Sequence, residues 1–128
     1  MKLHEEWLYK AENDLESAKL LLNSDKNLLD ICVYHTQQCA EKALKAFLTY
    51  KEQEIDKTHN LLFLISKCRI FYPEFENLKK EIVFINPYST QFRYPEGDLQ
   101  PSKDEAEQAV LYTEKILLFV KDKINEVS

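Results

Sequence analysis

The chain has 128 residues, of which 45% are hydrophobic and 30% are charged, and its formal net charge is −5. This composition is typical of one folded domain over residues 1–128 and excludes a disordered chain. The acidic balance disfavours a protein that coats nucleic acid through its overall charge, because such proteins usually carry a basic surplus. With Gly97 as the only glycine, few positions suit the left-handed turns of β-hairpins, so we expect an all-α fold.

The first two predicted helices are the longest continuous ones in the first half of the chain. Apolar residues recur at three- and four-residue steps from Leu3 to Asn23, with the acidic residues and lysines expected on the opposite, solvated face. Asn27 is expected to cap a second helix, which runs from Leu28 to Tyr50 or Lys51. Because this second helix carries two apolar rows, we expect neighbouring helices or a partner chain to contact it on several sides.

Shorter elements follow a charged loop over residues 52–57. Thr58 is expected to cap a third helix, and Pro73 is expected to begin a short fourth helix that ends at Phe84 or Ile85.

The last helix is predicted from Ser102, which forms a capping box with Glu105, to about Glu126. Between the fourth and last helices lies an aromatic-rich loop, Pro87 to Pro101, of a length that is often functional. Since the other connections are short, the sequence predicts an up-and-down antiparallel bundle of four to five helices.

The three cysteines, Cys32, Cys39 and Cys68, lack the spacing of metal ligands, so we expect them to be buried and reduced. No metal or cofactor is expected. The N-terminal residues lack an apolar signal region, and no stretch approaches the length of a membrane span. We therefore expect a cytoplasmic protein that does not enter a membrane.

One polar row stands out on the second helix, because its members are spaced three, four and three residues apart. These are His35, Gln38, Lys42 and Lys45. Two interpretations remain open. The row is either a solvated edge, in which Glu41 pairs with Lys45, or a cleft in which lysines bind phosphate and His35 supplies a hydrogen bond or a proton.

Two further candidates lie outside this helix. His59 precedes the third helix, where it serves either helix-entry hydrogen bonding or ligand binding. Arg93, between Phe92 and Tyr94, is suited to stack on a base and bind a phosphate with two donors. The alternative is a loop packed by its aromatic residues, with Arg93 paired to a surface acid.

The segment Tyr34–Phe47, with the sequence YHTQQCAEKALKAF, resembles the second-helix signature of HEPN domains. Three more segments resemble the family in the same order: Trp7–Leu15, Lys57–Leu61 and Phe92–Pro95. The resemblance implies an up-and-down bundle of four to five helices, a homodimer, and frequent pairing with a small nucleotidyltransferase in toxin–antitoxin-like arrangements.

Many family members are metal-independent endoribonucleases whose motif has an arginine a few residues before a histidine. Both arginines of this chain, Arg69 and Arg93, follow its last histidine, His59, so this motif cannot be formed. No catalytic residue is therefore assigned.

Three functions remain as hypotheses. The first is a non-catalytic HEPN module that binds a nucleotide or nucleic-acid phosphate and partners a nucleotidyltransferase. Its expected ligand-binding residues are His35, Gln38, Lys42, Lys45, His59 and Arg93. The second is a divergent endoribonuclease in which histidine acts as acid and base while Arg93 or Lys42 stabilises the transition state. The third is an interaction scaffold whose polar row is only solvated.

Overall fold

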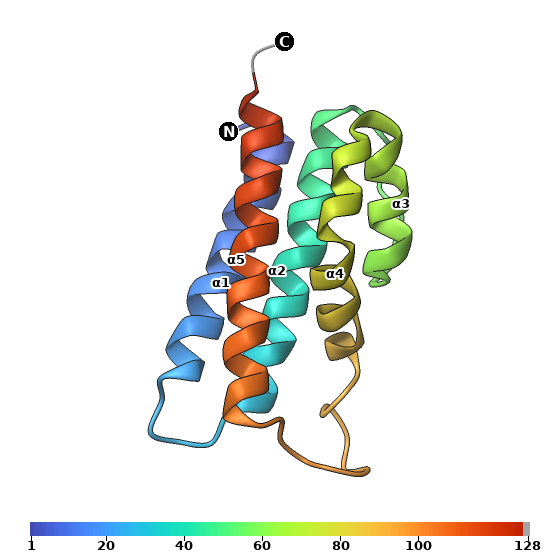
Figure 1. Cartoon of the computed structure of the whole chain (residues 1–128). Coiled ribbons are helices and arrows are strands. Elements are labelled where there is room, and N and C mark those ends of the chain that lie inside the picture. Colours follow the sequence, from blue (N-terminus) through green and yellow to red (C-terminus); the bar gives the residue numbers. More distant parts are fainter. Residues whose placement is uncertain (127–128) are drawn as a thin grey trace.

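The computed structural model describes residues 1–126, which fold into five α-helices and two short 3-10 helices (Figure 1). The elements in chain order are α1 (Leu3–Leu22), α2 (Leu29–Tyr50), α3 (Leu61–Phe71), η1 (Pro73–Leu78), α4 (Lys79–Ile85), η2 (Asn86–Ser89) and α5 (Lys103–Asn125). The described residues contain no strand, so the predicted all-α fold is confirmed.

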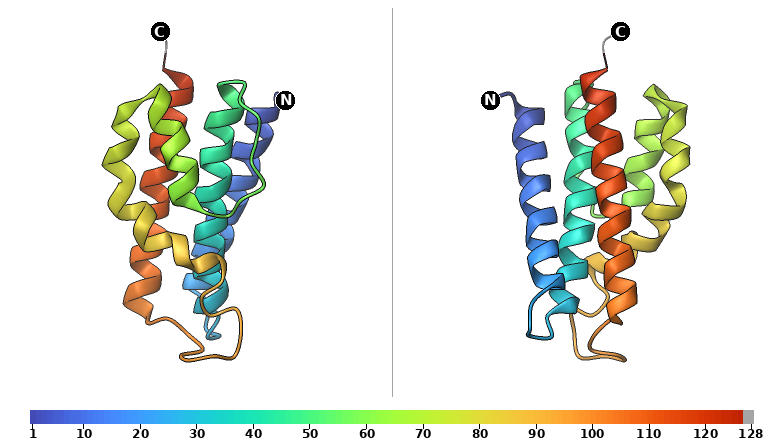
Figure 2. Two further views of the ribbon diagram at one scale, coloured as in Figure 1. Left: turned by 90° about the vertical axis from the view of Figure 1, so that its right-hand side faces the viewer. Right: turned by 60° about the vertical axis from the view of Figure 1, so that its left-hand side comes forward.

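The helices form a bundle in which α1 and α4 run in one direction and α2, α3 and α5 in the other (Figures 1 and 2). The up-and-down order is interrupted once, because α3 runs parallel to α2. The segment 51–60 returns along α2 before α3 begins, as the left view of Figure 2 shows. Accordingly, Gln37 of α2 donates to the carbonyl of His59 at 2.9 Å, and Cys68 contacts the carbonyl of Leu44 at 3.9 Å.

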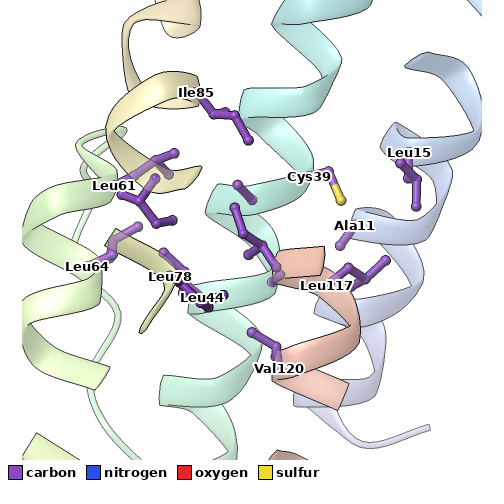
Figure 3. Packing of buried hydrophobic residues seen from close by; sticks show 14 of the residues in the cluster. Ala11, Leu15, Cys39, Leu44, Leu61, Leu64, Leu78, Ile85, Leu117 and Val120 are labelled. Atoms are coloured by element: carbon purple, nitrogen blue, oxygen red, sulfur yellow. The ribbon is translucent and has the colours of Figure 1, made fainter. Parts of the chain in front are cut away.

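The core lies around α2, as predicted from its two apolar rows. Phe47 is fully buried, and its ring centre lies 4.7 Å from that of Phe75. Figure 3 shows Leu44 close to Leu78 and Cys39 close to Ala11, so apolar side chains approach α2 from different sides. Except for Tyr50 at its end, which is exposed, both apolar rows of α2 are buried within the same chain, and they therefore give no argument for a partner chain.

Two of the predicted helix caps are wrong. Asn60, and not Thr58, caps α3, because its side-chain oxygen accepts from the amide of Leu62 at 3.0 Å. The Thr58 hydroxyl instead accepts from the Asn60 amide and shapes the approach to the helix. Asn27 does not cap α2, which begins after Leu28 with no side-chain cap.

The predicted start of α5 is confirmed, with one difference. The Ser102 hydroxyl accepts from the Glu105 amide at 3.0 Å, as a capping box requires. The Glu105 carboxylate accepts from the Tyr88 hydroxyl, so it does not complete the box. Pro73 begins a helical segment as predicted, but that segment is the 3-10 helix η1, and α4 follows it.

The three cysteines are buried and unpaired, as expected. Burial raises the pKa of the Cys32 thiol to about 11, so this thiol stays protonated at neutral pH. Among the described residues, none of the helices has the length and apolar character needed to cross a membrane.

Candidate functional site

The predicted polar row lies on the side of α2 that is bordered by α1 and by the segment 51–60. Asp14 of α1 contacts the row from one side, and His59 contacts it from the other. We use the name polar face for ten side chains: Asp14, Tyr34, His35, Gln37, Gln38, Glu41, Lys42, Lys45, His59 and Arg93. All six residues predicted from the sequence belong to it.

Asp14 joins α1 to α2 at one part of the polar face. Its Oδ1 lies 2.9 Å from Nδ1 of His35, and its Oδ2 lies 2.7 Å from Nζ of Lys42. The Asp14 side chain is only 10% exposed, whereas those of His35 and Lys42 are 28% and 25% exposed. Fully buried Ala11 and Ala18 flank Asp14 at steps of three and four residues, and their small side chains allow α1 to approach α2 closely.

The Asp14 carboxylate is charged at neutral pH and orients the imidazole of His35. Burial raises the pKa of Asp14, but the hydrogen bonds from His35 and Lys42 outweigh it and hold that pKa below its ordinary value. When Nδ1 of a neutral histidine donates to a carboxylate, Nε2 keeps its lone pair. Among the described residues, Nε2 of His35 makes no hydrogen bond, so it is available to a ligand.

Glu41 forms a second group, which joins α2 to the segment 51–60. Its Oε1 lies 2.7 Å from Nδ1 of His59, and its Oε2 lies 2.9 Å from Nζ of Lys45. Glu41 and Lys45 are only 6% and 8% exposed, whereas the His59 side chain is 72% exposed. The Lys45 ammonium also lies 5.9 Å from the ring centre of Trp7. The Glu41–Lys45 pair expected for a solvated edge is therefore present, but it is buried.

Two glutamines connect the polar row to the start of α3. Nε2 of Gln38 donates to Oε1 of Gln37 at 2.8 Å, and Nε2 of Gln37 donates to the carbonyl oxygen of His59 at 2.9 Å. The buried Gln37 thus satisfies a backbone carbonyl that has no partner in a helix. This connection fixes His59 relative to α2, although the two are far apart in the sequence.

Arg93 reaches the polar face from the loop that follows η2. Its guanidinium carbon lies 3.9 Å from the ring centre of Tyr34, and the Tyr34 ring lies 5.7 Å from the His35 ring. Within residues 1–126, Arg93 forms no ion pair with an acid. The loop is therefore not anchored by a surface ion pair of Arg93, and the guanidinium stacks beside the end of the polar row that contains His35.

Four members of the polar face were not predicted from the sequence: Asp14, Tyr34, Gln37 and, as the centre of a buried group, Glu41. Asp14 was expected on the solvated side of the first helix, which is wrong. The signal in the sequence was its position among Ala11, Leu15 and Ala18, where a carboxylate needs partners from another element. Tyr34 gave no such signal, because an aromatic residue at a helix edge usually packs against the core.

The polar face carries three permanent positive charges, on Lys42, Lys45 and Arg93, and two negative charges, on Asp14 and Glu41. Its small positive surplus contrasts with the net charge of −5 of the whole chain. Within residues 1–126, no group of three or more histidine, cysteine, aspartate and glutamate side chains is arranged to hold a metal ion. The arrangement is therefore suited to bind an anion through its lysine and arginine donors.

Residues 4–123 match the model of the HEPN domain, which covers nearly the whole chain. The chain belongs to the HEPN domain family. The predicted resemblance, drawn from four short segments, is thereby confirmed.

Named relatives support this assignment to the HEPN family. The chain is 30% identical over 134 residues to a Methanocaldococcus jannaschii protein named "Putative toxin MJ1304", with 94% of this chain and 87% of that protein covered. Its fold matches the crystal structure of ST0689, an archaeal HEPN homologue, with a TM-score of 0.79, 27% identity, and 98% and 100% of the two chains covered. The crystal structure of TT1696 from Thermus thermophilus gives a TM-score of 0.79 and 26% identity, with 96% and 99% covered.

Proposed function

We propose that this HEPN chain binds a phosphate group of a nucleotide or of RNA on its polar face without catalysing a reaction. We further propose that it forms a homodimer and pairs with a small nucleotidyltransferase in a toxin–antitoxin-like arrangement. The observation that carries the binding proposal is that the donors Lys42 and Arg93 lie along one side of α2, each held by a neighbouring side chain. Nε2 of His35, on the same side, is free to accept a hydrogen bond from another group of the ligand.

The lysines of the polar face have different roles in this proposal. Lys42 is a quarter exposed, and its ammonium group has three hydrogens, of which Asp14 accepts one. It therefore retains donors for a phosphate. Lys45 is 8% exposed and paired with Glu41, so it acts by holding Glu41 and His59 in position. Arg93 supplies a planar guanidinium, which binds phosphate oxygens in pairs.

The likeness to a protein named a toxin supports the toxin–antitoxin-like arrangement. The nucleotidyltransferase partner rests on the family resemblance. It predicts that co-expression of this chain with an adjacent nucleotidyltransferase gene gives a stable complex on size-exclusion chromatography. If the chain forms a homodimer, analytical ultracentrifugation at micromolar concentration should give the mass of two chains. A monomer at that concentration would contradict the proposed homodimer.

The binding proposal is tested by calorimetric titration of the purified chain with mononucleotides and a short single-stranded RNA. We expect saturable binding that weakens about tenfold or more in the double variant Lys42→Ala/Arg93→Ala, because two charge-assisted hydrogen bonds are lost. Lys79→Ala is the matched control, because this exposed lysine of α4 lies outside the polar face. Equal affinity in the double variant and the control would refute the proposed site.

A second candidate, a divergent endoribonuclease, is favoured by one observation. His35 and His59 are each held through Nδ1 by a carboxylate that is at most 10% exposed. A carboxylate–histidine pair is an arrangement that general acid–base catalysis uses. Cleavage of RNA without metal, lost on His35→Ala and retained in the control His4→Ala, would establish this function in place of simple binding.

A further inference from the structure

The loop between η2 and α5 borders an open pocket of about 840 Å³, which no step of the proposed phosphate binding uses. The loop lies at the end of the bundle away from the two termini (Figure 1). We call this space the loop cavity. It is lined by Thr90, Gln91, Phe92, Tyr94, Glu96, Gly97, Asp98, Gln100, Pro101, Ser102 and Glu105. Its volume falls in the range of sites for small molecules.

The charged lining of the loop cavity is entirely negative. Glu96, Asp98 and Glu105 line it, and no lysine, arginine or histidine does. Ionised carboxylates only accept hydrogen bonds, so this cavity disfavours phosphate and favours a group that presents N–H donors. The loop cavity and the polar face therefore suit chemically different groups.

Aromatic rings give the loop cavity flat surfaces. The Phe92 ring stacks on that of Tyr88, with ring centres 6.2 Å apart and an angle of 24° between the planes, which fixes Phe92 in place. Tyr94 is 71% exposed, so its ring is free to stack on a ligand. Stacking of a base on an aromatic side chain is favourable for every base, so these rings add affinity more than selectivity.

Arg93, between these two aromatic residues, contacts the polar face and does not line the loop cavity. Its guanidinium lies over Tyr34 of the polar face, while Phe92 and Tyr94 line the cavity. The backbone at Phe92 has a φ of +67°, a left-handed conformation that non-glycine residues rarely adopt. This turn lies where successive side chains point to different surfaces, Phe92 to the loop cavity and Arg93 to the polar face. One short loop thus contributes to the loop cavity and to the polar face at once.

Glu105 is the best-positioned carboxylate of the loop cavity. One of its oxygens accepts from the hydroxyl of Tyr88, which is 3% exposed. Its amide is held by the Ser102 hydroxyl, and its place in the first turn of α5 stabilises its negative charge. Among the described residues its other oxygen, Oε1, makes no hydrogen bond, so it is available to a donor in the cavity.

We propose that the loop cavity takes a guanine base, either of a mononucleotide or of RNA, whose phosphate binds the polar face. This inference rests on the proposed function. Guanine carries two adjacent donors, N1–H and the 2-amino group, on one edge, which match the acceptors of a carboxylate. Adenine and cytosine place an acceptor beside the amino group, and uracil places its single N–H between two acceptors. Each of these edges would direct a lone pair at a carboxylate.

The test is calorimetric titration of the full chain with GMP, AMP, CMP and UMP. We expect GMP to bind about tenfold more tightly than the other three, because a good paired contact to a base discriminates by about this factor or more. Glu105→Gln is expected to remove the preference for GMP. Glu107→Gln is the matched control, because this exposed glutamate lies on the same helix but outside the cavity lining.

Two further measurements keep the outcomes distinct. If Glu105→Gln disturbs folding, seen by circular dichroism, Asp98→Asn in the exposed loop replaces it with the same expected direction. Guanosine, which lacks phosphate, is expected to bind the double variant Lys42→Ala/Arg93→Ala as well as it binds the wild type. Equal affinity for all four mononucleotides, lost in that double variant, would overturn the guanine site and leave the proposed function standing. Absence of binding by any mononucleotide or RNA would overturn both.

Discussion

The two carboxylates of the polar face each hold one histidine and one lysine, but they do so in different surroundings. Asp14 belongs to α1 and holds two side chains of α2, which are each about a quarter exposed. Glu41 belongs to α2 itself and holds a buried lysine of the same helix together with an exposed histidine of the segment 51–60. One group joins two long helices, and the other joins a helix to a segment without regular structure.

This difference separates what each group contributes. The Asp14 group leaves its histidine and lysine accessible, so it is placed to serve a ligand. The Glu41 group buries its lysine, so most of its effect is on the stability and position of the segment 51–60. A charge that is buried with its partner becomes costly when that partner is removed, whereas a partly exposed charge regains water.

Glu41→Gln is expected to have the largest effect on stability. The substitution leaves the Lys45 ammonium, 8% exposed, without a charged partner, and should lower the free energy of unfolding by about 3 kcal/mol. Urea denaturation followed by circular dichroism measures this change. Glu107→Gln, at an exposed position of α5, is the control and should change it by less than about 0.5 kcal/mol. A similar small loss in Glu41→Gln would show that Lys45 reaches solvent when unpaired.

Asp14→Asn is expected to have a smaller effect, about 2 kcal/mol, because His35 and Lys42 are partly exposed and regain water. The same urea denaturation measures it. A loss greater than that of Glu41→Gln would reverse the ranking of the two groups. The variant should also weaken any nucleotide binding, since the carboxylate no longer orients His35 and Lys42.

Acid is expected to weaken the Asp14 group in a defined direction. The pKa of Asp14 in the folded chain lies below its ordinary value of 3.8, because the hydrogen bonds from His35 and Lys42 outweigh its burial. Its stabilising contribution is therefore complete above about pH 4 and is lost as the pH falls through the lower folded-state pKa. Below pH 4, the stability of the wild type should approach that of Asp14→Asn. A difference that stays constant down to pH 2 would contradict this.

His59→Ala is expected to have the smallest effect, below about 0.5 kcal/mol, because the side chain is 72% exposed. The neighbouring Gln37 still binds the carbonyl at residue 59 in this variant. Thermal unfolding with His4→Ala as the control measures the difference. A loss comparable to that of Asp14→Asn would mean that the histidine, and not the glutamine, secures the segment 51–60.

The sequence predicted the helices well, because hydrophobic periodicity is a local signal that depends only on spacing. It predicted the direction of α3 less well. The length of the connection over residues 51–60 permits either direction, and contacts such as Gln37 with His59 decide it. The cap of α3 differs from expectation because two polar residues, Thr58 and Asn60, compete at that helix start, whereas α2 begins after Leu28 with no side-chain cap at all.

In the candidate site, too, the residues that follow from local spacing were predicted, and those that depend on packing between elements were not all predicted. The row of His35, Gln38, Lys42 and Lys45 followed from helical spacing alone. The partners that give the row its geometry come from other elements, as Asp14 and Arg93 do, and no spacing rule connects them. Their pairing depends on how α1 and the loop after η2 pack against α2, which is a property of the whole bundle.

The position of Trp7 has a practical consequence. It is the only tryptophan of the chain, and its ring lies 5.9 Å from the Lys45 ammonium, at the border of the polar face. Indole emission responds to nearby charge and to water. The protein therefore contains a fluorescent reporter beside the Glu41 group, and a ligand that displaces water or shifts Lys45 should change the emission without any added label.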